Sequence, residues 1–239
     1  MSGSLYLSTS GAEARLQQID ALSNNLANSG TAGFRATEVS FEGALEAALL
    51  EGEAGGGRSF VAADLSSLRL EPGPVEQTGR ALDVAIQGEG YFIIETPEGI
   101  RHTRAGSFHV DPQGFLATHS GHPVLGNGGP IQVGQRPATI QADGAVIDDE
   151  GTVLGRLRLE QFLEPAEIQR EGGNLLRVSE DTVVFPVDGP AFAPASIEGS
   201  NVRTVQELAR LVIVQRAFDA SMRTLEAEDA ASSRLLQEI

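Results

Sequence analysis

The C-terminal run Asn201–Ile239, NVRTVQELARLVIVQRAFDASMRTLEAEDAASSRLLQEI, decides how the rest of the chain is organised. It contains neither Gly nor Pro, the two residues that most disrupt the interior of a helix. Asn201 can cap the first free amides, and Thr204 and Glu207 have the spacing of a capping box. The run therefore predicts one helix that is about 55 Å long at about 1.5 Å per residue.

Apolar residues recur along this predicted helix with heptad spacing. Six of nine seam positions are apolar when the count starts at Leu208: Leu208, Leu211, Gln215, Phe218, Met222, Leu225, Asp229, Ser232 and Leu236. A stripe this narrow is typical of a helix that packs against a partner helix. A helix that packs into the core of its own domain is the alternative, and the polar positions at the far end do not favour it.

A second helical pattern covers Leu5–Asn28. The same count gives five apolar residues at seven seam positions: Leu5, Thr9, Ala12, Leu16, Ile19, Ser23 and Leu26. Asn28, Ser29 and Gly30 then provide a helix stop. Neither helix can bury its stripe alone, so we expect the two to pair with each other or with neighbours, and to be partly disordered in a free monomer.

Between the helices the apolar pattern changes to a period of two, which is typical of strands. The candidate strands are Phe60-Val61, Leu68–Leu70, Leu82–Ile86, Tyr91–Ile94, Ile100–Arg104, Ser107–Val110, Phe115–Thr118, Ile131–Val133, Thr139–Ala142, Ala145–Ile147, Val153–Leu163, Leu175–Val178 and Thr182–Val187. Turn signals separate them at Asp111–Gly114, Asn127-Gly128 and Asp143-Gly144. Short strands with such turns predict an antiparallel sandwich or partly open barrel.

The predicted fold class is α+β, with long N- and C-terminal helices that pair as a coiled-coil-like element and a mainly antiparallel β central domain. Residues 1–30 are the expected N-terminal assembly helix and 31–75 an arm or linker. Residues 76–190 form the β-rich domain, and 191–239 form a linker and the C-terminal assembly helix. Within the arm, a short helix is expected around Phe41, Leu45 and Leu49, followed by a flexible loop at Glu51–Gly57.

Composition excludes several classes of protein. The chain has 239 residues, 41% of them hydrophobic, and no Cys, which rules out disulfides and thiol catalysis. The net charge is -16 and every basic residue other than His is an Arg, so nucleic-acid binding is not expected. No apolar run approaches the ~18 residues of a membrane span. The N-terminus lacks the basic and apolar regions of a Sec signal peptide, which predicts a cytoplasmic protein or export without a cleaved signal.

No catalytic, cofactor-binding or metal-binding site is predicted. The four histidines lie in the β-rich region, and His119 and His122 are separated by Ser120-Gly121, which favours a surface turn over a metal-binding helix. Any pair of carboxylates could imitate a glycosidase dyad, but Asp111 and Asp143 fall in predicted turns, where Asp stabilises the backbone. An enzyme is therefore not expected.

Three stretches resemble the flagellar axial proteins, the rod and hook family of the bacterial basal body. They are SNNLANSGTAGFRA (Ser23–Ala36), LDVAIQGEGYFIIETPEG (Leu82–Gly99) with TRAGSFHVDPQGFLATHSGHPVLG (Thr103–Gly126), and Glu198–Leu236. The residues that carry the motif are Asn24, Asn25, Leu26, Asn28, Gly33, Phe34, Asn201, Val202 and Arg216. Within the family the short chain is most similar to proximal-rod subunits, and less to distal-rod or hook subunits. Arg35, where many members carry Lys, and the segment Glu51–Gly57 depart from the family pattern.

The resemblance implies a structural function. The chain would be exported by the flagellar type III apparatus without a cleaved signal. It would assemble with copies of itself and neighbouring rod subunits into a torque-transmitting shaft that spans the periplasm. The terminal helices would carry the assembly through Leu5, Leu16, Ile19, Leu26, Leu208, Leu211, Gln215, Phe218, Met222 and Leu225. Asn25, Asn28, Gly33 and Phe34 would shape the exit from the first helix. The resemblance implies no cofactor, nucleic acid or membrane insertion.

Two functions from other classes remain open. One is a secreted β-domain that binds a ligand and is dimerised by its helices, although the absence of Trp leaves few aromatic residues for stacking on sugars. The other is an acidic hydrolase, which would lose activity on substitution of a single carboxylate. Neither function explains a helix at each end of the chain.

Overall fold

The computed structural model describes residues 2–39, 66–162, 168–172, 174–179 and 182–237. The chain forms two compact units. The helical unit comprises Met1–Ser29, Ala36–Arg69 and Val202–Ile239, and the β-rich unit comprises Gly30–Arg35 and Leu70–Asn201. The predicted short helix at Phe41–Leu49, the loop at Glu51–Gly57 and the strand Phe60-Val61 lie outside the described residues.

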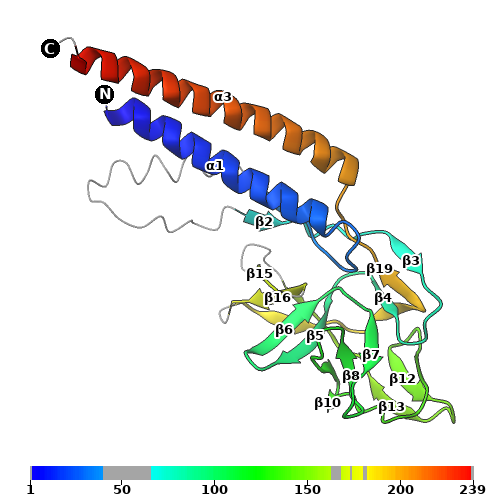
Figure 1. The fold of residues 1–239 in the computed structure, drawn as a ribbon. Coiled ribbons are helices and arrows are strands. Elements are labelled where there is room, and N and C mark those ends of the chain that lie inside the picture. Colours follow the sequence, from blue (N-terminus) through cyan, green and yellow to red (C-terminus); the bar gives the residue numbers. More distant parts are fainter. Residues whose placement is uncertain (1, 40–65, 163–167, 173, 180–181, 238–239) are drawn as a thin grey trace. The chain divides into compact units, whose positions relative to one another are not determined.

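The helical unit contains two helices, α1 (Ser2–Ala27) and α3 (Thr204–Gln237), and the antiparallel strands β1 (Thr37–Val39) and β2 (Ser66–Leu68). The helices lie side by side and run in opposite directions (Figure 1). Glu207 lies in the first turn of α3, where a carboxylate is favourable to the helix dipole. None of the described helices is long and apolar enough to cross a membrane.

The prediction that two long helices pair as a coiled-coil-like element is wrong. α1 has 26 residues against 34 in α3, and the predicted seam is not buried. Leu208 is 49% exposed, and Gln215 and Met222 are exposed one and two heptads further on. The half-buried stripe of α3 instead passes through Leu211, Val214, Phe218, Ser221 and Leu225. Apolar residues lie on more than one face of α3, so spacing alone does not identify the buried face.

The β-rich unit is built from short antiparallel strands. Their bounds are β3 (Val75–Gln77), β4 (Val84–Gln87), β5 (Tyr91–Thr96), β6 (Gly99–Thr103), β7 (Phe108–Val110), β8 (Leu116–Thr118), β9 (Val124–Gly126), β10 (Gly129–Pro130), β11 (Ala138–Ile140), β12 (Ala145–Asp148), β13 (Val153–Arg156), β14 (Leu159–Phe162), β15 (Ile168–Glu171), β16 (Leu175–Val178), β17 (Val184–Pro186), β18 (Ala191–Pro194) and β19 (Ser196–Glu198). The largest sheet has the order β10-β9-β5-β6-β16-β15, with β14 pairing with both β5 and β17. The smaller sheets are β11-β12-β13, β18-β4, β19-β3 and β7-β8.

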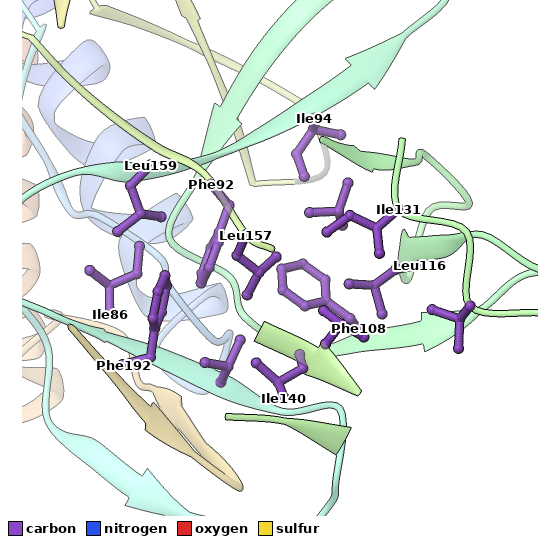
Figure 2. Close-up of a cluster of buried hydrophobic side chains, with 14 of the residues drawn as sticks. Ile86, Phe92, Ile94, Phe108, Leu116, Ile131, Ile140, Leu157, Leu159 and Phe192 are labelled. Atoms are coloured by element: carbon purple, nitrogen blue, oxygen red, sulfur yellow. The ribbon is translucent and has the colours of Figure 1, made fainter. Parts of the chain in front are cut away.

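One hydrophobic core holds these small sheets together (Figure 2). Phe92 on β5 is fully buried, with its ring edge-on to Phe108 at a centroid distance of 5.1 Å and stacked on Phe192 at 6.2 Å. Leu116, Ile140 and other aliphatic side chains fill the space around the rings. Burying one such side chain contributes about 1.5–3 kcal/mol, so the shared core compensates for strands of only two to six residues.

The predicted turns are present, and their Asp side chains bind the backbone. Asn127-Gly128 is the two-residue loop between β9 and β10, where Gly126 pairs with Gly129. In the β7–β8 turn Gly114 N donates to Asp111 O at 3.0 Å, and the Asp111 carboxylate accepts the Phe115 amide at 2.7 Å. In the turn between β11 and β12, the Asp143 carboxylate accepts a hydrogen bond from the Ala145 amide at 3.1 Å. These carboxylates therefore act as turn residues.

Several strand predictions differ from the structure, and β1, β3, β9, β10 and β15 lie outside the predicted strands. The predicted strand Val153–Leu163 is divided into β13 and β14, which belong to separate sheets, and Leu157 between them forms an isolated bridge with Gly126. Ile131–Val133 forms only an isolated bridge at Gln132. Residues 188–200, expected as a connecting segment, include β18 and β19, which pair with β4 and β3. Pairing with strands distant in sequence overrides the local Pro and Gly content there.

Candidate assembly surface and the segments that lead to it

The most exposed apolar side chains of the described helices lie on α3. Val205 is 81% exposed and Ile213 is 66% exposed, and Leu208 and Val212 are also exposed. Val205, Leu208 and Val212 are three and four residues apart, so they form one row on the helix surface. We call these three residues the outer row of α3; Ile213 lies about 100° further round the helix from Val212, on a different face. A soluble surface does not need such a row, which makes it a candidate for contact with another subunit.

The described side chains of α1 are mainly half-buried or exposed. Ala12 and Ala14 are buried and Leu16 is exposed, whereas Ile19 and Leu26 are half-buried. Leu5 belongs to α1, but its side chain lies outside the described residues. Because Ala12 and Ala14 are small, the backbone of α1 can approach a neighbouring element closely. The two side chains bury little apolar area, so they contribute little to the stability of that contact.

Asn25 joins the end of α1 to β1. Its Nδ2 donates to Thr37 O at 2.8 Å, and its Oδ1 accepts the Thr37 amide at 2.9 Å. The side chain is buried and satisfies both backbone groups of one residue, as a neighbouring strand would. At the helix end, Asn28 donates from Nδ2 to Asn24 O at 2.9 Å, and Ser29 Oγ donates to Leu26 O at 2.9 Å.

A second polar group of the helical unit surrounds Glu207. This carboxylate is buried, at 3.8 Å from Arg69 and 3.7 Å from Arg210. Glu38 on β1 lies 3.6 Å and 3.5 Å from the same two guanidinium groups. Glu207, Arg210 and Glu38 also line a cavity of about 220 Å³ with the apolar residues Leu22 and Val214. The distances are those of a loose ion network, so its contribution to stability is small.

In the β-rich unit, Gly33 and Phe34 belong to a segment that makes close contacts with residues distant in the sequence. Gly33 has φ +67°, and a Cβ there would lie 2.3 Å from the Ala105 amide nitrogen, so only Gly fits. Phe34 is buried, with the Arg170 guanidinium carbon 4.0 Å from its ring centroid. Asn174 Nδ2 donates to Ala32 O at 2.6 Å.

Three buried charges lie beside this segment. Arg35 Nη1 is 2.5 Å from Glu198 Oε1, and Arg104 Nη1 donates to Glu198 Oε2 at 3.3 Å. The Glu198 Oε1 atom also accepts the Gly73 amide at 3.1 Å. Burial lowers the pKa of Arg104 from its usual value, and the Glu198 carboxylate opposes that shift. We call Arg35, Glu198 and Arg104 the ionic clamp.

His102 is the buried histidine of the β-rich unit. His102 Nε2 lies 2.8 Å from Glu160 Oε2, and the ring is edge-on to Phe162. Burial lowers the pKa of His102, and the contact with Glu160 partly opposes the shift. His119 is exposed and His122 is half-buried. Among the described residues, no group of three or more His, Asp or Glu could hold a metal ion.

The structure separates the predicted assembly residues into two sets. Leu211, Phe218 and Leu225 are half-buried, as are Ile19 and Leu26, whereas Leu16, Leu208, Gln215, Met222 and Arg216 are exposed. The motif residues Asn25, Gly33 and Phe34 are buried, and Asn201 and Val202 are half-buried.

Sequence reasoning missed Val205 and Val212 of the outer row, the exposed Ile213 on another face, and Arg104 and Glu198 of the clamp. The available signal for the outer row was that Val205 and Val212 are apolar although they lie outside the heptad seam counted from Leu208. The buried charges have no local signal, because their partners lie far apart in the sequence.

Comparison with known proteins covers the same segments. Three family models match the chain: "Flagella basal body rod protein" over residues 5–35, "Flagellar hook protein FlgE/F/G D1 domain" over 85–155, and "Flagellar basal body rod FlgEFG protein C-terminal" over 193–238. The flagellar basal-body rod protein FlgF of Mesorhizobium japonicum is 35% identical over 98% of this chain and 95% of its own length. The chain belongs to the flagellar basal-body rod protein family.

Other relatives agree with this assignment. FlgF of Escherichia coli is 34% identical over 99% of this chain and 98% of its own length. The rod protein FlgG of Bacillus subtilis is 31% identical over 99% and 97%. The predicted resemblance to the rod family, with FlgF nearer than FlgG, is therefore confirmed, and the chain is a structural rod protein. The first and last matches cover α1 with Gly33 and Phe34, and β19 with α3.

Proposed function

We propose that this rod-family chain is a subunit of the proximal section of the flagellar rod, and that it joins copies of itself and neighbouring rod subunits through α1 and α3. The main support for the proposal is the outer row of α3, where Val205 is 81% exposed and Leu208 is 49% exposed. Burial of three such side chains against neighbours supplies a favourable free energy that the free chain lacks. The β-rich unit, with its own core, contributes a rigid body to the assembled shaft.

Export through the flagellar type III apparatus, without a cleaved signal peptide, is part of the proposal and rests on the family. N-terminal sequencing of the protein recovered from basal bodies tests it, because a cleaved signal would move the first residue into α1. Placement in the proximal rather than the distal rod rests on the greater similarity to FlgF than to FlgG.

The assembly surface is tested with Leu208→Asp, which places a charge in the outer row. Leu208 is half exposed, so the substitution leaves the packing of the free chain largely intact. We expect the variant to melt like the wild type but to be missing from basal bodies isolated from a strain that carries it as the only copy.

The matched control is Gln206→Asp, which adds the same side chain to an exposed position of the same turn, on a different face of α3. This variant should be incorporated. Normal incorporation of Leu208→Asp would contradict the proposed surface.

A further inference from the structure

Two chain segments of the β-rich unit lead directly to the helices. The exit segment, Gly30–Arg35, follows α1 in the sequence, and the entry segment, Glu198–Asn201, precedes α3. They bind each other through the backbone, because Gly33 N donates to Glu198 O at 2.7 Å and Asn201 N donates to Phe34 O at 3.2 Å. The exit and entry segments, which are far apart in the sequence, are thereby paired with each other next to the ends of the two helices in the chain.

The ionic clamp adds a side-chain link to this pairing. Arg35 comes from the exit segment and Glu198 from the entry segment, whereas Arg104 follows β6. Arg35 is 2% exposed and Glu198 is 1% exposed, so the charges are removed from water and from screening by salt. Behind them, Arg170 donates to Arg35 O and covers the Phe34 ring.

The clamp is poorly suited to a purely stabilising function. One carboxylate faces two guanidinium groups, and no guanidinium nitrogen of Arg35 has a hydrogen-bond partner among the described residues. Buried ion pairs of this kind often contribute less stability than apolar residues of the same volume would. Their advantage is geometric, because the charged groups specify which segments meet.

We propose that Arg35 and Glu198 are positioning residues for assembly, which fix the spacing of the two segments from which α1 and α3 extend. Both helices are then connected to segments whose spacing is fixed within the β-rich unit. The inference rests on the proposed function, since it assumes that the helices carry the assembly. Arg104, which follows β6, donates a hydrogen bond to Glu198 and belongs to neither segment.

Arg35→Met tests the link between the segments. It removes one cation and leaves Glu198 paired with Arg104, so no buried carboxylate is left without a counter-charge. In the purified full-length chain, we expect the amides of Gly33 and Asn201 to exchange about tenfold faster or more, while core amides such as Phe92 are unchanged. Incorporation of this variant into isolated basal bodies should fall.

Arg104→Met is the matched control. It also removes one buried cation, but it leaves the Arg35–Glu198 link in place. Because Arg104 also donates to Gly88 O at 2.9 Å, this variant should lose at least as much thermal stability as Arg35→Met. We nevertheless expect the Gly33 and Asn201 amides to remain protected and the protein to be incorporated. Arg35→Lys retains the cation and should restore both properties in part.

Two results would overturn the inference: identical exchange at Gly33 and Asn201 in the two Met variants, or normal incorporation of Arg35→Met despite faster exchange. The exchange measurement uses the free chain, so it does not depend on assembly. Failure of the proposed function is recognised separately, by normal incorporation of Leu208→Asp.

Discussion

At the scale of single residues, buried polar side chains hold the irregular parts of this chain together. Asn25 binds both backbone groups of Thr37, as a neighbouring strand would, and Glu198 contacts Gly73, Arg35 and Arg104 from three different segments. A buried polar group left without its partner costs about 1–3 kcal/mol. We therefore expect Asn25 and Glu198 to tolerate substitution less well than exposed positions do.

His102 gives the β-rich unit a defined pH dependence. Burial lowers its pKa in the folded chain below the value of about 6.5 expected for the unfolded chain. As the pH falls through about 6.5 the unfolded chain takes up the proton first, so stability is lost on acidification and is fully present above that pH. Protonation would also place an N–H on Nδ1, which is buried and has no partner in the described part of the chain.

The prediction is tested by thermal unfolding between pH 7.5 and 5.5. We expect the melting temperature of the wild type to fall over this range and that of His102→Gln to fall less, because Gln does not titrate and its amide can still donate to Glu160. His119→Gln, at an exposed position, serves as the control and should follow the wild type. Equal pH dependence in all three proteins would show that another group is responsible.

At the scale of elements, α3 has two apolar surfaces, for which we propose different functions. The half-buried stripe through Leu211, Val214 and Phe218 lies within the helical unit, and the outer row is exposed. The heptad count from Leu208 mixes members of both surfaces. Because the two surfaces lie on different faces of α3, a substitution in one surface should not change the contacts of the other.

Phe218→Asp tests the half-buried stripe. A charge at this position opposes the packing of the helical unit, so we expect faster amide exchange in α1 and α3 and loss of assembly. The β-rich unit has a separate core and should keep its melting temperature. Ala220→Asp, on an exposed position of the same helix, should leave the exchange of α1 unchanged. Unfolding of the β-rich unit by Phe218→Asp would show that the helices belong to its core.

At the scale of the whole molecule, the two units differ in how much apolar surface they bury. The β-rich unit has a core of fully buried Phe, Ile, Leu and Val side chains, whereas the only buried apolar side chains on the described parts of α1 and α3 are Ala12 and Ala14. Helices with so little buried area are marginal in water without partners. The assembled rod is therefore where the helical unit should be most stable.

Hydrogen exchange of the full-length chain measures this difference. In the free protein we expect fast exchange along α1 and α3 and slow exchange in β5 and the strands around it. Mixing with other rod subunits should slow exchange in the helices alone. The net charge of -16 opposes association of identical chains, so the effect should grow with salt concentration. Helices that are already protected in the lone chain would contradict the expectation.

The amino-acid sequence by itself determined the local elements and the family. α3 follows where Gly and Pro are absent, and α1 follows the apolar spacing although it contains Gly3 and Gly11. Turns follow where Asp, Asn and Gly occupy positions that their side chains and backbone favour. These preferences act within a few residues, so α1, α3 and the β7–β8 and β9–β10 turns could be predicted. The family motifs are also local, and the matches cover the same segments.

Only the tertiary structure decided which helix face is buried and which charges meet. Leu208 and Leu211 have the same hydrophobicity and seam assignment, yet one is exposed and the other half-buried. Arg35, Arg104 and Glu198 come together from three distant segments. Burial and ion pairing depend on residues that are distant in the sequence and meet only in the folded chain. The residues next to each position in the sequence therefore do not predict its burial or its ion pairs.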